Sequence, residues 1–125
     1  MRIVDLLCRR PALLWWPIFS QPAPTIQKDF PLLSGQIVDM AIWDTQNYWL
    51  VRVLAENASD FEFERAVFEC VSFKAAFSAE LYGRPEALVV PVLFVAREVQ
   101  EPLVDWAFEL GLFVRCVNLD YGLYG

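Results

Sequence analysis

The residues of this chain that could carry chemistry are carboxylates, because the sequence contains no histidine. The absence of histidine removes the commonest general base and the commonest zinc ligand. The three cysteines, Cys8, Cys70 and Cys116, are far apart and fit neither a zinc cluster nor a disulfide framework. We interpret them as buried, reduced thiols. One of these carboxylates, Asp39, lies within a run of β-forming residues at 36–43.

A metal-dependent reaction needs more than Asp39. A hard divalent cation such as Mg²⁺ requires at least two carboxylates that converge with substrate oxygens, and a nearby lysine can orient the attacking water. The residues that could complete such a set lie further along the chain: Glu56, Glu62, Glu64, Glu69 and Lys74.

Both parts of this candidate set have a simpler interpretation. Glu62, Arg65 and Glu69 are spaced three and four residues apart, which is typical of an ion-paired helix face exposed to water. Asp39 is equally well interpreted as a hydrogen-bonded aspartate of a hairpin or of the protein interior. These residues alone therefore assign no metal ligand and no cofactor-binding residue.

The elements that would position Asp39 form a predicted β-hairpin. Residues 36–43 and 48–54 are both rich in β-formers. The four residues between them, Asp-Thr-Gln-Asn, favour a turn because aspartate and asparagine bond locally to the backbone.

The rest of the chain predicts alternating helices and buried strands. A long helix capped by Ser59 or Asp60 should run to about Tyr82 and end at Gly83. A buried strand follows at 87–96, where Pro91 suggests an edge position or a bulge. A second helix should begin near Glu101 and close at Gly111, before a last strand at 112–119.

These elements define the expected fold class. A helix between two buried strands implies a right-handed parallel crossover. The prediction is therefore an α/β fold whose mixed sheet combines an antiparallel hairpin with parallel strands and is flanked by helices.

The N-terminal segment differs in character from the rest. A short helix is expected around residues 3–7, ending before Pro11. Residues 11–31 contain five prolines and several large aromatic side chains, and we expect them to be extended or irregular. The aromatic residues Trp15, Trp16 and Phe19 either wrap the domain's own core or bind a protein partner or a second copy of the chain.

Length and composition bound the remaining alternatives. The 125 residues predict one domain, with residues 1–31 as an N-terminal segment and 32–125 as the core. The net charge of −6 argues against binding nucleic acid. Prolines interrupt the longest uncharged stretch, and the N-terminus lacks the layout of a signal peptide, so we expect a cytoplasmic protein without a membrane span. Hydrophobic residues make up 57% of the chain, which favours self-association.

The order of elements, together with several residues, resembles the PD-(D/E)xK nuclease superfamily, which has the restriction-endonuclease-like fold. In that family a strand carrying an aspartate leads through a short hairpin to a strand carrying Glu-x-Lys. Asp39 stands where the family's first metal-binding aspartate would be. The segment Ala-Val-Phe-Glu-Cys-Val-Ser-Phe at 66–73 is similar to the helix after the motif, in which a glutamine often occupies the place of Glu69.

The Glu-x-Lys signature is absent from the second strand of the hairpin. An ungapped comparison with the family places Val53 at the glutamate and Ala55 at the lysine, and a shift of one residue places Arg52 and Leu54 there. Two residues apart on a strand, a glutamate and a lysine would point the same way and meet Asp39 across the hairpin. Neither register supplies them, so the resemblance leaves Asp39 as a vestigial catalytic candidate only.

Three hypotheses of function follow. The first is a catalytically inactive nuclease-like domain that acts as a protein-interaction or assembly module. The second is a metal-dependent nuclease with a rearranged active site around Asp39. The third is an unrelated small α/β structural subunit.

Overall fold

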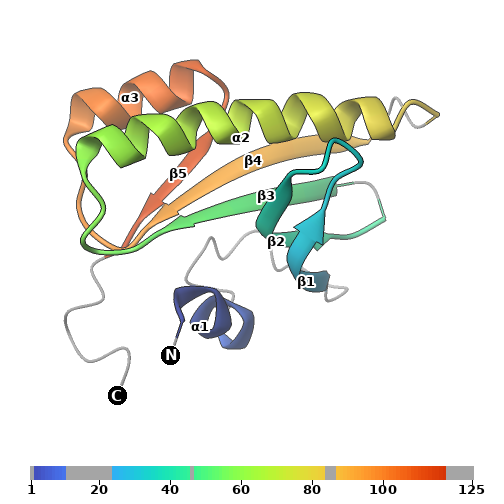
Figure 1. The fold of residues 1–125 in the computed structure, drawn as a ribbon, viewed down its shortest axis with the longest axis horizontal. Coiled ribbons are helices and arrows are strands. Elements are labelled where there is room, and N and C mark those ends of the chain that lie inside the picture. The colour runs from blue at the N-terminus through green and yellow to red at the C-terminus, as the bar shows by residue number, and fades with distance from the viewer. Residues whose placement is uncertain (1, 11–23, 46, 84–86, 118–125) are drawn as a thin grey trace.

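The computed structural model describes residues 2–10, 24–45, 47–83 and 87–117, and these residues form three helices and a five-stranded sheet (Figure 1). In chain order the elements are α1 (Ile3–Arg9), β1 (Thr25–Pro31), β2 (Ile37–Trp43), β3 (Asn47–Leu54), α2 (Asp60–Glu80), β4 (Leu88–Val95), α3 (Glu101–Glu109) and β5 (Phe113–Cys116). Among the described residues, no helix is both long and apolar enough to span a bilayer.

The sheet is mixed, as the sequence predicted. Its strands lie in the order β1-β2-β3-β4-β5. β2 pairs antiparallel with β1 and β3, whereas β4 pairs parallel with β3 and β5. The predicted antiparallel hairpin and the parallel pairing of the last two strands are both confirmed, and β3 lies where the two patterns meet.

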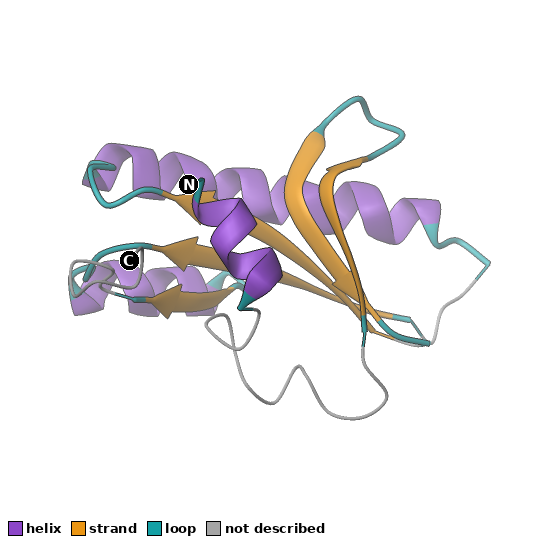
Figure 2. Ribbon diagram, turned by 90° about the horizontal axis from the view of Figure 1, so that it is seen from below, coloured by secondary structure: helices purple, strands orange, loops and turns teal. Residues whose placement is uncertain are grey.

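The helices cover both faces of the sheet. α2 and α3 lie side by side on one face, and α1 lies on the other (Figures 1 and 2). The thiol of Cys8 on α1 is 3.4 Å from the sulfur of Met40 on β2, and Asp5 pairs with Lys28 of β1 at 2.7 Å. These contacts fix α1 to β1 and β2.

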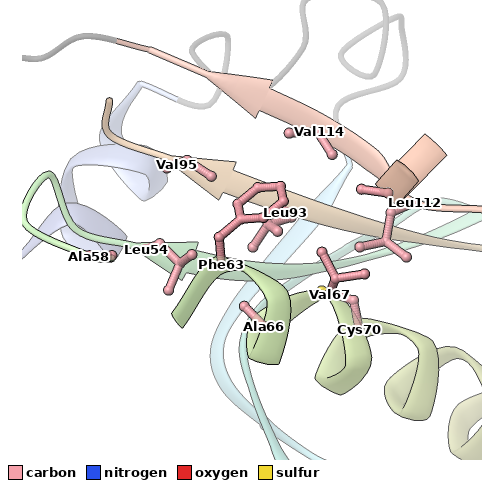
Figure 3. Close-up of a cluster of buried hydrophobic side chains, with 11 residues drawn as sticks. Leu54, Ala58, Phe63, Ala66, Val67, Cys70, Leu93, Val95, Leu112 and Val114 are labelled. Carbon is pink, nitrogen blue, oxygen red and sulfur yellow. The ribbon is translucent and has the colours of Figure 1, made fainter. Parts of the chain in front are cut away.

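The side chains of β3 alternate between the two faces, as the period of a strand requires. Val51 and Val53 belong to a hydrophobic cluster between the sheet and α1, whereas Leu50 and Leu54 pack on the other face, against α2. In the α2 cluster, Phe63 is directed toward the sheet and lies near Leu93 of β4 (Figure 3). Both faces of β3 are therefore buried, and Arg52 is the one charged residue within it.

The long helix begins and ends close to the predicted residues. Ser59 is the N-cap, and its hydroxyl oxygen accepts a hydrogen bond from the backbone N–H of Glu62 at 3.1 Å. The helix ends at Glu80, two residues before the expected end. In α3 the predicted start at Glu101 is confirmed, and Gly111 closes the helix with a positive φ of 89° that favours glycine.

Two segments that contain proline form strands. Part of the segment expected to be extended or irregular forms β1, an edge strand whose register with β2 is interrupted at Asp29, where φ is +50°. β4 is an internal strand, which corrects the edge position that Pro91 suggested. Pro91 pairs with Leu50 of β3, but pairing with β5 starts only at Val92, so the missing N–H of proline falls outside the doubly paired stretch.

An aromatic cluster joins β1, β2, β3 and the C-terminal half of α2. Phe30 lies 5.6 Å from Trp43 and 5.5 Å from Phe77, measured between ring centroids. Tyr48 contacts Phe77 edge-on at 4.9 Å. The β1–β2 turn is tied to the same helix, because the backbone N–H of Leu33 donates to Glu80 at 2.9 Å. The described residues do not include Trp15, Trp16 and Phe19, which were predicted to pack on the domain's own core or to bind a protein partner or a second copy.

Two phenylalanines of α2 provide a direct test of this packing. Phe63 is fully buried, whereas Phe61 is 71% exposed. We expect Phe63→Ala to lower the free energy of unfolding by about 3–5 kcal/mol, because it leaves a cavity in the core. Phe61→Ala should change it by less than about 0.5 kcal/mol. Urea denaturation followed by circular dichroism measures both, and equal effects of the two substitutions would contradict the packing described for α2.

Candidate functional site

The site begins with Asp39, which lies in β2 opposite the second half of β3. Its Oδ2 atom accepts hydrogen bonds from the backbone N–H of Val53 at 2.7 Å and from Nη1 of Arg52 at 3.0 Å. The interpretation of Asp39 as a hydrogen-bonded aspartate of the hairpin is thus confirmed. Its side chain remains 29% exposed, so solvent still reaches the carboxylate.

Arg52 holds two carboxylates that come from different elements. Its Nη1 atom binds Asp39 of β2, and its Nε atom donates to Oε2 of Glu69 on α2 at 3.1 Å. Nη1 also donates to the backbone carbonyl of Val53 at 2.7 Å. Burial alone would lower the pKa of Arg52, but the two carboxylates reverse this and raise its pKa above the ordinary value. The guanidinium therefore stays charged and links β2, β3 and α2.

The predicted helical ion pair between Arg65 and Glu69 is present, but Glu69 has a second and closer partner. Arg65 does lie one helical turn away, but its Nε atom is 3.9 Å from Glu69, whereas Arg52 is at 3.1 Å. Arg65 is also 75% exposed, so water screens that contact. The principal partner of Glu69 is in the sheet.

An open groove of about 650 Å³ adjoins this charged cluster. Arg2, Ile3 and Val4 at the start of α1 form one side. The other side is formed by residues of β2 and β3 and of the loop that follows: Asp39, Arg52, Val53, Ala55 and Glu56. Asp39 and the two positions that an ungapped comparison assigned to Glu and Lys therefore line one groove.

The composition of the groove limits the chemistry it can support. Val53 and Ala55 offer neither a carboxylate oxygen nor an ammonium group, so Asp39 has no partner at those positions with which to chelate Mg²⁺. Within the described residues, no cluster of three or more acidic or cysteine side chains could hold a metal ion. Glu69, the second carboxylate near Asp39, already balances the charge of Arg52.

The other candidate residues are not brought to the groove, with one exception. Glu56 lines it together with Asp39. Glu62, Glu64 and Lys74 are exposed on α2 and are absent from the groove lining.

Sequence reasoning missed the roles of Arg52 and Arg2. Arg52 was considered only as an occupant of the glutamate position, not as a cation that binds the aspartate. The available signal was a lone charge within a strand otherwise made of apolar and aromatic residues, because such a charge requires a partner. Nothing in the sequence pattern placed Arg2 in a groove with β3.

The cysteines take no part in this site's chemistry. Cys70 is buried, and its burial raises the pKa of the thiol to about 12, so it remains protonated near neutral pH. Cys8 and Cys116 are half-buried, and burial raises the pKa of each thiol as well. The expectation of reduced thiols holds, but full burial was correct for Cys70 alone.

Comparison of the chain with protein-family models, with curated proteins and with solved structures found no match. The resemblance to the nuclease superfamily consequently rests on the residues and element order described above.

The cluster can be tested by a double-mutant cycle. Arg52→Met leaves the Asp39 and Glu69 carboxylates without their shared cation, and we expect it to lower the free energy of unfolding by about 1–3 kcal/mol. The double variant Arg52→Met with Glu69→Gln should lower the free energy of unfolding by less than the sum of the two single substitutions, because the amide no longer needs the cation. Arg65→Met is the control, with an expected effect below about 0.5 kcal/mol. Strict additivity in urea titrations would show that Arg52 and Glu69 do not interact.

Proposed function

We propose that this chain is a catalytically inactive, nuclease-like domain that acts as a protein-interaction or assembly module. The observation that carries the proposal is the guanidinium of Arg52 between Asp39 and Glu69. In the nuclease superfamily that the chain resembles, a metal ion would be bound at the aspartate. Here the guanidinium of the protein neutralises the Asp39 carboxylate instead. A guanidinium has no exchangeable ligand position at which water could be activated.

The arrangement around Asp39 supports the ancestry in this proposal. Asp39 lies on one strand of an antiparallel hairpin, β3 follows it, and a helix then leads to a parallel strand. This is the order that the resemblance implies. Val53 and Ala55 line the groove beside Asp39, as a degenerate Glu-x-Lys would.

Two surface properties support the interaction role. Large apolar side chains remain exposed on the helical layer, including Phe61 and Phe68 at 71% and 60%. Exposed aromatic residues of this size are enriched where proteins bind one another. The net charge of −6 opposes the approach of a nucleic-acid substrate.

The absence of catalysis is tested with purified protein. We expect no cleavage of supercoiled plasmid, single-stranded DNA or RNA with Mg²⁺ or Mn²⁺, because the loss of the carboxylate and lysine should slow the reaction by roughly a thousandfold or more. Asp39→Ala controls for contaminating nucleases. Robust cleavage that disappears in Asp39→Ala would contradict the proposal.

That result would select the second candidate, a metal-dependent nuclease with a rearranged site. One observation favours it, namely that Glu56 shares the groove with Asp39. If the pair binds the metal, Glu56→Gln should abolish cleavage, whereas Glu64→Gln should preserve it, because Glu64 lies on α2 and is absent from the groove lining.

The assembly role predicts self-association through the N-terminal aromatic residues. Modest interfaces associate at a concentration of about 50 μM. At that concentration we expect sedimentation velocity to show a dimer or a larger species. Replacing Trp15, Trp16 and Phe19 by serine should yield a monomer, because the apolar area available for burial is lost. A monomeric wild-type protein would contradict this prediction.

A further inference from the structure

An apolar surface without a partner among the described residues lies across α2 and α3. We call it the α2–α3 surface and define it by Phe61, Phe68 and Val71 of α2 with Trp106 of α3. Phe61 and Phe68 are 71% and 60% exposed. Phe68 contacts Trp106 edge-on, with ring centroids 5.5 Å apart, so the two helices contribute to one continuous surface. Figure 1 shows both helices on the same face of the sheet.

The spacing of these residues fits a helical partner. Phe61 and Phe68 are seven residues apart on α2, which is two helical turns or about 10 Å. Val71 extends the apolar row to ten residues, roughly 15 Å. A partner helix that presents apolar residues at positions i, i+3 or i+4, and i+7 would match a row of this length.

Acidic side chains surround the surface. α2 and α3 together contain eight acidic and two basic residues, so these two helices carry a charge of −6, as large as that of the whole chain. Glu64 lies one turn before Phe68, and Asp105 and Glu109 lie beside and one turn after Trp106. In the part of the chain that the structure describes, none of these three carboxylates forms an ion pair, whereas the basic Arg65 lies 3.9 Å from Glu69.

This charge decides which partner fits. A second copy that presents the same face would place acidic residues against acidic residues, which disfavours association. Nucleic acid and anionic lipid headgroups would be repelled for the same reason. A helix with lysine or arginine on either side of an apolar ridge would bury the aromatic rings and pair with the acidic rim.

We propose that the α2–α3 surface is a docking site for a basic amphipathic helix of a partner protein. The proposal deepens the interaction role suggested above and depends on it. The apolar contacts supply the affinity, and the acidic rim supplies the selection for a basic partner.

The test uses three synthetic helical peptides of about 18 residues, long enough to cover the apolar row. They share one apolar ridge and carry Lys, Gln or Glu at the flanking positions. With the full chain and fluorescence anisotropy, we expect affinity to decrease in the order Lys, Gln, Glu. Added salt should weaken binding of the Lys peptide and leave the Gln peptide unaffected, because only charged contacts are screened.

Variants locate the binding surface. Phe68→Ser should weaken binding of the Lys peptide by about tenfold or more, as expected when an aromatic residue at the centre of an interface is lost. Leu33→Ser is the matched control, because Leu33 is an 87% exposed apolar residue on the β1–β2 turn. The double variant Glu64→Gln with Asp105→Asn should weaken binding of the Lys peptide and leave binding of the Gln peptide unchanged.

Three outcomes would overturn the proposal: a Glu peptide that binds as tightly as the Lys peptide, unchanged binding in Phe68→Ser, or a dimer that Phe68→Ser dissociates. The last result would assign the surface to a second copy. Failure here is distinguishable from failure of the proposed function, because metal-dependent cleavage and the serine variant of the N-terminal aromatic residues are measured separately.

Discussion

The burial of β3 on both faces is the constraint on which the structure depends. β3 joins the antiparallel and parallel halves of the sheet, and α1 and α2 cover its two faces. A charge in such a strand is tolerated only if its hydrogen bonds and its charge are satisfied locally. Arg52 meets this requirement with one carboxylate from β2 and one from α2. The same contacts thereby fix how the hairpin and the long helix are oriented.

Much of the fold was predictable, because local residue pattern and tertiary environment agree at most positions. Runs rich in β-forming residues identified β2 and β3, and the Ser59 cap and Gly111 marked helix ends that the structure confirms. The position of β4 in the sheet was predicted less well. Pro91 suggested an edge position or a bulge, but the effect of proline depends on whether a neighbouring strand reaches its nitrogen, and β5 does not.

The site was only partly predictable, because its decisive contact joins residues 17 positions apart in different elements. Asp39 was identified through the resemblance, from its place on the first strand of the predicted hairpin. The spacing of Glu69 and Arg65 correctly indicated a helical ion pair, but spacing along one helix carries no information about what the adjacent sheet presents. Only the packing of α2 on β3 reveals that Arg52 lies closer to Glu69 than Arg65 does.

Under the function proposed above, the difference between a guanidinium and a metal ion explains how the site keeps its architecture without the reaction. Both neutralise converging carboxylates, so either one allows acidic residues to remain at the centre of the fold. A divalent cation also binds water, lowers its pKa and polarises a phosphoryl oxygen. The guanidinium of Arg52 uses its contacts with Asp39, Glu69 and the Val53 carbonyl to hold protein groups in place. The proposed interaction role instead uses the surfaces that this scaffold presents, and its helical layer carries the exposed Phe61 and Phe68 together with an excess of negative charge.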